Sequence, residues 1–249
     1  MTHKILVVDD EESIRFTFSA FLTDAGYTVD TAENLEEALA RVAASPYAAI
    51  FLDILLGRDS GMQVLQVCRE KQPSTPIIMV TGAPEVKTAA EAVRLGAFDY
   101  IPKPVHQDEL LRQAKIAVDH KALVDLQEAY RLRMAAVFQS ICEGVVIFDE
   151  DMKLLEMNSA AAKILGCDAQ LTGLNPEELG DCCPALKLLQ ETIEQRCEGE
   201  LFRLETTDGA GQPLVLGLTM APLTGQGERE LGTVLVLRDE RLPVRQVEM

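Results

Sequence analysis

The stretch ILVVDD, residues 5–10, places four apolar residues directly before two acids. Comparable short apolar runs recur further along the chain, at residues 27–31, 48–52, 77–80 and 98–101. Several of these runs are too continuously apolar for a sheet with one face in water, so helices are expected on both faces. Five strands alternating with helical patterns predict a doubly wound α/β domain with a parallel five-stranded sheet.

Five residues able to take part in chemistry follow the ends of these predicted strands. They are Asp9 and Asp10 after the first strand, Asp53 after the third, Thr81 after the fourth and Lys103 after the fifth. Because the carboxyl ends of parallel strands meet at one edge of a sheet, these side chains are expected to lie together. Clustered carboxylates repel one another unless a cation neutralises them, and hard oxygen ligands suit Mg²⁺. Such a set is equipped for phosphoryl transfer, with Asp53 attacking in line while the metal, the hydroxyl and the ammonium stabilise the phosphoryl oxygens.

Residues 1–120 are similar to the receiver domain of bacterial two-component response regulators, which has a flavodoxin-like fold. The resemblance rests on the acid pair, the acceptor acid, the hydroxyl and the pair Lys103-Pro104. It implies that Asp9 and Asp10 hold Mg²⁺, that Asp53 is phosphorylated by a cognate sensor histidine kinase, and that Lys103 contacts the phosphate. It also implies that the protein is no enzyme beyond catalysing its own Mg²⁺-dependent phosphorylation and dephosphorylation.

The same resemblance assigns roles to neighbouring positions. The backbone carbonyl of Leu55 is implied as a further metal ligand, Thr81 as the switch hydroxyl, and Tyr100 as the aromatic residue whose rotation reports phosphorylation. The sequence departs from the family at Gly57, where a proline is usual. Because proline fixes φ and glycine frees it, the loop after Asp53 is expected to be more mobile.

A long helix is predicted over residues 106–140, which contain neither Gly nor Pro and carry five acids and five bases. Within it Ile116, Leu123, Tyr130 and Val137 fall at seven-residue spacing, with two more apolar residues beside them. This spacing is typical of a coiled-coil seam, so a homodimer through this helix is expected. The alternative is a terminal helix that packs on its own domain and is followed by a linker.

Residues 141–240 show a different order of elements. Strands are predicted at 145–148 and 153–157, then a short helix capped by Asn158-Ser159 and ended by Gly166, a second helix at 185–196, and three strands near 201–206, 213–220 and 231–238. This order predicts an α+β fold with an antiparallel sheet and helices on one side. Residues 241–249 are expected to form a tail.

The segment over residues 143–166 resembles the opening of a PAS domain, and the resemblance extends over about residues 130–240. It implies a module that senses a small ligand or redox state, or mediates dimerisation, and that passes a signal through its flanking helices. The sequence does not identify the PAS ligand. All three histidines of the chain precede residue 141, so histidine-ligated haem is not expected.

The chain is strongly acidic, with 23 Lys and Arg against 40 Asp and Glu and a formal net charge of -17. Direct binding to nucleic acid or to an anionic membrane is therefore not expected. No apolar run approaches the roughly 18–20 residues needed to span a bilayer, and a cytoplasmic protein with reduced cysteines is predicted. Cys182 and Cys183, with Cys167 and Cys197 nearby, could bind a metal through thiolates, but the absence of Cys-x-x-Cys spacing favours small buried side chains.

Together these patterns predict a response regulator that accepts a phosphoryl group on Asp53 and relays the signal through a helix to the PAS-like domain, with a downstream partner that the sequence does not name. Two alternatives stay open. A DNA-binding transcription regulator would need a basic recognition helix, but residues 141–249 carry nine Lys and Arg against twenty Asp and Glu. A fragment of a hybrid histidine kinase would need a phospho-accepting histidine, but Lys121 rather than an acid follows His120, and no Gly-rich ATP-binding region appears.

Overall fold

The structure is a computed structural model of the 249-residue chain, and it describes residues 3–82, 86–167, 173, 201–207, 213–225, 227 and 229–240. The chain divides into two compact units, Met1–Tyr130 and Arg131–Met249. The helix predicted at 185–196, the cysteines Cys182, Cys183 and Cys197, and the predicted tail at 241–249 lie outside the described residues.

The first unit is built on a parallel sheet of five strands in the order β2-β1-β3-β6-β7. The strands are β1 (Lys4–Val8), β2 (Thr28–Ala32), β3 (Ala49–Asp53), β6 (Ile77–Thr81) and β7 (Asp99–Pro102). The helices between them are α1 (Glu12–Asp24), α2 (Leu35–Ala44), α3 (Gly61–Lys71) and α4 (Val86–Arg94). The predicted doubly wound α/β fold is therefore confirmed, and its strand order reverses between β1 and β3.

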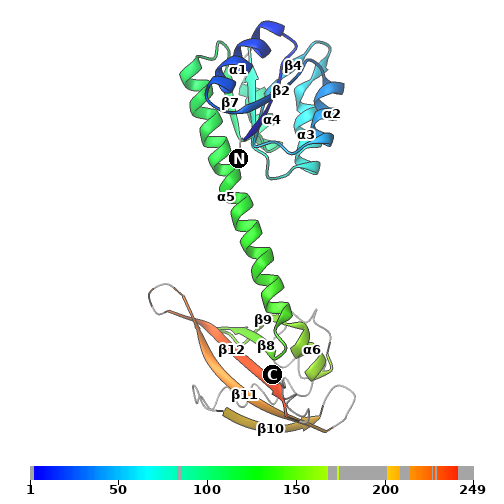
Figure 1. The fold of residues 1–249 in the computed structure, drawn as a ribbon, viewed down its shortest axis with the longest axis vertical. Helices are drawn as coiled ribbons and strands as arrows, with labels where there is room; N and C mark the ends of the chain where they lie inside the picture. Colours follow the sequence, from blue (N-terminus) through cyan, green and yellow to red (C-terminus); the bar gives the residue numbers. More distant parts are fainter. Residues whose placement is uncertain are drawn as a thin grey trace, which may run out of the picture. The chain divides into compact units, whose positions relative to one another are not determined.

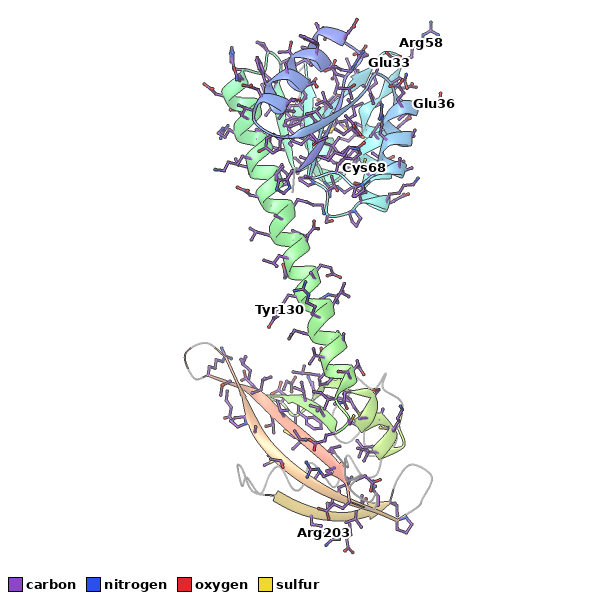
Figure 2. The ribbon with its side chains drawn as sticks, in the orientation of Figure 1. Glu33, Glu36, Arg58, Cys68, Tyr130 and Arg203 are labelled. Atoms are coloured by element: carbon purple, nitrogen blue, oxygen red, sulfur yellow. The ribbon has the colours of Figure 1, made fainter. Side chains whose placement is uncertain are left out.

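Alternate residues of β1 face opposite sides of the sheet. Ile5 and Val7 pack in a core with α1 and the start of α5, whereas Leu6 and Val8 pack in a second core with α2, α3 and α4. Cys68 of α3 lies in this second core (Figure 2), where burial raises the pKa of its thiol to about 11. Because both faces of the sheet are covered, the first strand has to be apolar along its whole length.

Asp30 of β2 gathers polar partners on one side of the sheet. Its Oδ2 accepts a hydrogen bond of 2.7 Å from the Tyr47 hydroxyl, and it lies 2.8 Å from Lys4 Nζ and 3.8 Å from Arg41 Nη1. Burial by itself would raise the pKa of Asp30, but these hydrogen bonds and positive charges outweigh it and hold the pKa below its ordinary value. The ionised carboxylate thus ties β2 to its neighbours.

A short hairpin that the sequence does not predict follows β3. In it β4 (Leu55–Leu56) pairs antiparallel with β5 (Asp59–Ser60). Gly57 lies in the turn with a φ of 64°, a conformation that glycine adopts readily and proline cannot. The Gly57 N–H also donates a hydrogen bond of 3.1 Å to Oδ2 of Asp10. The loop after Asp53 is therefore a turn hydrogen-bonded to Asp10, and its greater mobility stays a prediction.

Helix α5 (Gln107–Ser140) crosses the division between the two units. Its first turns pack on the first unit, where Leu110, Ala114, Ala117 and Val118 are buried. The predicted seam is exposed, at 45% for Ile116, 67% for Leu123, 62% for Tyr130 and 55% for Val137. Figure 2 shows the Tyr130 side chain projecting from the helix. None of the helices in the described part of the chain, α5 included, is long and apolar enough to cross a membrane.

The second unit contains an antiparallel sheet in the order β10-β11-β12-β8-β9 (Figure 1). Its elements are β8 (Gly144–Asp149), β9 (Leu154–Met157), α6 (Ser159–Leu165), β10 (Leu201–Thr207), β11 (Pro213–Thr224) and β12 (Glu230–Asp239). Helix α6 ends at Gly166, whose φ of 66° is left-handed, as the sequence predicts for a glycine C-cap. The predicted α+β fold with an antiparallel sheet is confirmed.

Asn158 is a fully buried polar junction within the second unit. Its Oδ1 accepts hydrogen bonds from the N–H groups of Val145 (2.9 Å) and Ala161 (2.8 Å). Its Nδ2 donates to carbonyl oxygens at the end of α5 and just after it, on Phe138 (3.3 Å), Ile141 (3.4 Å) and Glu143 (2.9 Å). One side chain therefore joins the end of α5 to β8 and caps α6, the cap that the sequence predicts.

Candidate functional site

The predicted strand-end residues converge at one edge of the first sheet. Asp9 directly follows β1, Asp53 ends β3, Thr81 ends β6 and Lys103 directly follows β7. The edge includes the point where the strand order reverses, between β1 and β3, which is where ligands bind in open α/β sheets. One carboxylate oxygen from each of Asp9, Asp10 and Asp53 lies within 4.8 Å of the others.

Lys103 is the positive centre of this cluster. Its Nζ lies 2.7 Å from Asp53 Oδ2, 2.8 Å from Asp9 Oδ2 and 3.3 Å from Glu11 Oε1. Burial of the side chain would lower the pKa of Lys103, but the hydrogen bonds and charges of Asp53 and Asp9 outweigh it and raise that pKa above its usual value. Lys103 is therefore held as an ammonium between two carboxylates.

Glu11 also belongs to this cluster, because its carboxylate contacts Lys103. It occupies the N-cap position of α1, and its N–H donates a hydrogen bond of 2.9 Å to Asp9 Oδ1. Asp9 is only 2% exposed, and burial raises the pKa of its carboxyl group while Lys103 and the Glu11 N–H oppose that rise. Glu11 and Lys103 are far apart in the sequence, so no local sequence pattern predicts their contact.

Asp10 and Arg15 complete the first loop of the site. Asp10 is exposed, and its Oδ2 accepts the hydrogen bond from Gly57. Arg15 of α1 donates from Nη1 to the backbone carbonyl oxygens of Asp9 (2.8 Å) and Asp10 (3.0 Å). Sequence reasoning missed Arg15 because a base in the first turns of an amphipathic helix resembles an ordinary solvated residue.

Residues that follow Asp53 in the chain position its side chain and its backbone. The side chain is buried, and its Oδ1 accepts a hydrogen bond of 3.2 Å from the Leu55 N–H. Gly61, the first residue of α3, packs so closely that a Cβ there would lie 2.0 Å from the Asp53 carbonyl oxygen. Gly61 was also missed from sequence, because its requirement for glycine comes from a tertiary contact rather than from its turn.

The remaining predicted residues surround this centre. Thr81 is 1% exposed, and its carbonyl oxygen accepts a hydrogen bond of 2.6 Å from the Lys103 N–H. Tyr100 of β7 is half-buried, with its hydroxyl 3.4 Å from Thr88 Oγ1. The Leu55 side chain is 60% exposed, and its carbonyl oxygen stays a predicted metal ligand. The switch roles of Thr81 and Tyr100 likewise stay predictions.

The donor set fits Mg²⁺. Mg²⁺ prefers oxygen ligands and is usually held by one or two carboxylates while it keeps several waters. Asp10 is exposed, and one carboxylate oxygen of the buried Asp53 lies within 4.8 Å of an Asp10 oxygen, so both can offer oxygen atoms to an ion that keeps part of its water shell. Lys103 already offsets part of the negative charge, so a divalent ion would complete the neutralisation of the three carboxylates.

When the strands of the parallel sheet are counted along the chain, the order β2-β1-β3-β6-β7 becomes 2-1-3-4-5. This order and the acidic edge place the first unit in the flavodoxin-like class of α/β domains. Comparison with known families then identifies both parts of the chain. Residues 5–115 match the response regulator receiver domain, and residues 132–202 match the PAS domain. The chain therefore carries a response regulator receiver domain followed by a PAS domain.

Two curated relatives agree with this assignment, and a solved structure is similar to part of the chain. The chain is 37% identical over 135 residues to the nitrogen assimilation regulatory protein NtrX of Azorhizobium caulinodans, an alignment that covers 53% of this chain and 28% of NtrX. It is 36% identical over 161 residues to the transcriptional regulatory protein DltR of Streptococcus agalactiae, covering 65% of this chain and 66% of DltR. The solved receiver domain protein of Methanospirillum hungatei is 30% identical, with a TM-score of 0.48, and covers 49% of this chain and 98% of that one.

The chain thus spans little more than a quarter of the length of the first of these relatives. The relatives are signalling regulators rather than classical enzymes, and the coarse assignment to two-component signalling rests on the receiver domain itself.

Proposed function

We propose that Asp53 accepts a phosphoryl group from the phosphohistidine of a sensor histidine kinase, in a reaction that depends on Mg²⁺ bound at Asp9, Asp10 and Asp53. The observation that carries this proposal is the placement of Lys103 Nζ within 2.8 Å of both Asp9 and Asp53, beside three clustered carboxylates. An ammonium and a divalent ion beside the Asp53 carboxylate form the charge arrangement that phosphoryl transfer requires.

The chain's own residues account for most of the reaction. An Asp53 carboxylate oxygen forms a bond to phosphorus as the bond from phosphorus to the kinase imidazole breaks, and the departing imidazole keeps that electron pair. Lys103 exchanges its hydrogen bond with Asp53 for one with a phosphoryl oxygen, and the Thr81 hydroxyl donates to another. Bound Mg²⁺ would shield the phosphoryl oxygens from the carboxylates. The Leu55 N–H keeps the other Asp53 oxygen in place.

A direct test replaces the acceptor. The parent protein is incubated with acetyl phosphate and Mg²⁺, and the phosphorylated fraction is measured by intact mass. Asp53→Asn should abolish labelling, whereas Asp59→Asn should label like the parent, because Asp59 is an exposed acid of the same loop outside the cluster. Labelling of Asp53→Asn at the parent rate would refute the acceptor assignment.

The signal is proposed to leave the receiver through α5. In this scheme Thr81 moves toward the new phosphoryl group, Tyr100 takes up the released space, and the packing beneath the start of α5 changes. The receiver then occupies residues 1–120, α5 serves as signalling helix over 106–140, and the PAS-like domain occupies residues 141–240. The protein is proposed to be cytoplasmic, and the ligand of its PAS domain is not identified.

The exposed seam of α5 supports a homodimer as the form that carries the signal. Four large apolar side chains stay exposed at seven-residue spacing, the arrangement that a second copy of the same helix would cover. Leu123→Asp should weaken self-association in sedimentation runs with and without beryllium fluoride, because a charge in an apolar seam is costly. Leu132→Asp is the matched control, since Leu132 is 58% exposed on the same helix but off the seam. Identical self-association of all samples would exclude the seam as the interface of a homodimer.

A second candidate function is transcription regulation, which the printed names of DltR and the alginate biosynthesis regulator AlgB of Pseudomonas aeruginosa favour. Residues 141–249 carry nine Lys and Arg against twenty Asp and Glu, and this negative charge opposes binding to the DNA phosphates. A gel-shift titration of this chain on mixed-sequence DNA at low salt, with and without beryllium fluoride, separates the two functions. Binding would favour the regulator of transcription.

A further inference from the structure

The Arg15 side chain binds the backbone of the acid pair. Its Nη1 donates to the carbonyl oxygens of both Asp9 and Asp10, at 2.8 and 3.0 Å. Its Nη2 lies 3.6 Å from Glu33 Oε2, in the loop that follows β2, and its side chain is only 15% exposed. This guanidinium therefore bridges two loops at the edge of the sheet.

The two carbonyl groups belong to the segment between the end of β1 and the start of α1. Within this segment the Asp9 N–H is bonded to the Ala32 carbonyl oxygen at 3.2 Å, which continues the pairing with β2. The carbonyl groups of Asp9 and Asp10 are beyond that pairing, so Arg15 supplies a partner that the sheet does not. Fixing both carbonyl groups fixes the directions in which the two side chains leave the backbone.

We propose that Arg15 is a positioning residue for metal binding, one that holds Asp9 and Asp10 in the arrangement that receives Mg²⁺. This inference rests on the proposed function, because it takes these two acids as metal ligands. In the described part of the chain, the polar contacts of the Arg15 side chain are with the carbonyl oxygens of Asp9 and Asp10 and with Glu33. Arg15 acts through the backbone of the ligands, as the outer partners of metal ligands do in other sites.

Electrostatics and positioning predict opposite results when Arg15 is removed. The guanidinium is positively charged and close to the acid cluster, so its charge opposes the approach of a cation. If charge were its main effect, a neutral replacement would bind Mg²⁺ more tightly than the parent. If positioning dominates, the same replacement binds Mg²⁺ more weakly, because the acids must be ordered when the ion binds. The sign of the change therefore decides between the two.

The ion pair with Glu33 provides a matched control. The Glu33 side chain is 57% exposed, and an exposed ion pair contributes little. Glu33→Gln removes this charge next to Nη2 and leaves both hydrogen bonds from Nη1. It should bind Mg²⁺ like the parent if the carbonyl contacts are what matters.

The experiment titrates the full chain with Mg²⁺ in a calorimeter, using the parent, Arg15→Met, Arg15→Lys and Glu33→Gln. Arg15→Met removes the charge and the donors, whereas Arg15→Lys keeps the charge but loses the planar guanidinium. We expect the Mg²⁺ dissociation constant to rise about tenfold or more in both Arg15 variants, the range for loss of a partner behind a metal ligand. Glu33→Gln should stay at the parent value.

A second readout separates positioning from a general loss of structure. Labelling by acetyl phosphate is followed over a range of Mg²⁺ concentrations, with urea unfolding in EDTA as a measure of stability. The half-saturating Mg²⁺ concentration should shift in the Arg15 variants while the rate at saturating Mg²⁺ stays within about threefold of the parent, since the acceptor and Lys103 are untouched. If Arg15→Met does not fold, Arg15→Lys decides.

Mg²⁺ affinity of Arg15→Met or Arg15→Lys equal to the parent's, or tighter, would overturn the inference. A loss of rate at saturating Mg²⁺ with no shift in half-saturation would overturn it as well. Failure of the parent itself to bind Mg²⁺ would instead refute the proposed metal site, so the two failures are distinguishable.

Discussion

Replacing Gly61 by alanine should disturb Asp53 without touching any charged group. A Cβ on Gly61 would lie 2.0 Å from the Asp53 carbonyl oxygen, 3.1 Å from its carbonyl carbon and 3.3 Å from Leu52 Cγ. Real Cβ contacts essentially never fall below 3.0 Å, so the start of α3 or the end of β3 has to move by about 1 Å. Neither can move freely, because the Gly61 N–H is bonded to the Ile54 carbonyl oxygen at 2.8 Å.

The expected cost of this overpacking is about 1–3 kcal/mol in the free energy of unfolding. A displacement of about 1 Å at a reacting carboxylate can slow a reaction about 100-fold, so labelling of Asp53 by acetyl phosphate at saturating Mg²⁺ should fall by up to that factor. Stability is measured by urea unfolding followed by far-ultraviolet circular dichroism, and labelling is measured by intact mass.

Gly82→Ala is the control, because a Cβ on Gly82 meets nothing within 4 Å. This control should keep both the stability and the labelling rate of the parent, although Gly82 directly follows Thr81. If Gly61→Ala were as stable and as reactive as Gly82→Ala, the close approach of α3 to Asp53 would play no part in positioning this proposed acceptor.

Three further outcomes are expected. Gly57→Pro restores the usual family residue, but it should lower stability and weaken Mg²⁺ binding in calorimetry, because the turn needs a φ of 64° and the Gly57 N–H bonds Asp10; unchanged binding would show that this bond is dispensable. Asp30→Asn should lower the free energy of unfolding by about 1–2 kcal/mol at pH 7. Because the pKa of Asp30 is depressed in the folded state, this loss of stability, measured by urea unfolding, should shrink as the pH falls below the unfolded pKa of 3.8. A loss of stability that does not depend on pH would contradict the ionised state assigned to Asp30. Asn158→Ala leaves buried donors and acceptors unpaired, so it should destabilise the second unit by about 2–3 kcal/mol while Asp53 still labels; loss of labelling together with folding would show that the two units do not fold independently.

The strands and the strand-end chemistry could be predicted because both are local in the sequence. An apolar run such as residues 5–8 has to be buried on both faces, and the polar residue that ends it marks the sheet edge. For the five strands of the parallel sheet, the predicted bounds therefore differ from the observed ones by at most one residue at either end. The long helix was predictable for the same reason, since residues 106–140 contain no helix breaker.

What the sequence could not supply depends on contacts between distant segments. Glu11 and Arg15 resemble ordinary helix-start residues until the fold brings Lys103 and the backbone of the acid pair beside them. The hairpin over residues 55–60 has strands of two residues, too short to show periodicity. Gly61 is required by a carbonyl oxygen eight positions earlier rather than by its own turn.

The two sheets also differ in when they can be completed during synthesis. In the receiver, β1 pairs with β2 and β3, and each later strand adds to the growing edge, so the sheet can be built as the chain emerges. In the second unit, β8 pairs with β12, a partner about ninety residues later, and such distant pairings form slowly. Until β12 is made, the hairpin of β8 and β9 has an open edge available to other chains. A ribosome pause within β11 would therefore prolong the interval in which newly made PAS domains can associate wrongly, while the receiver is already folded.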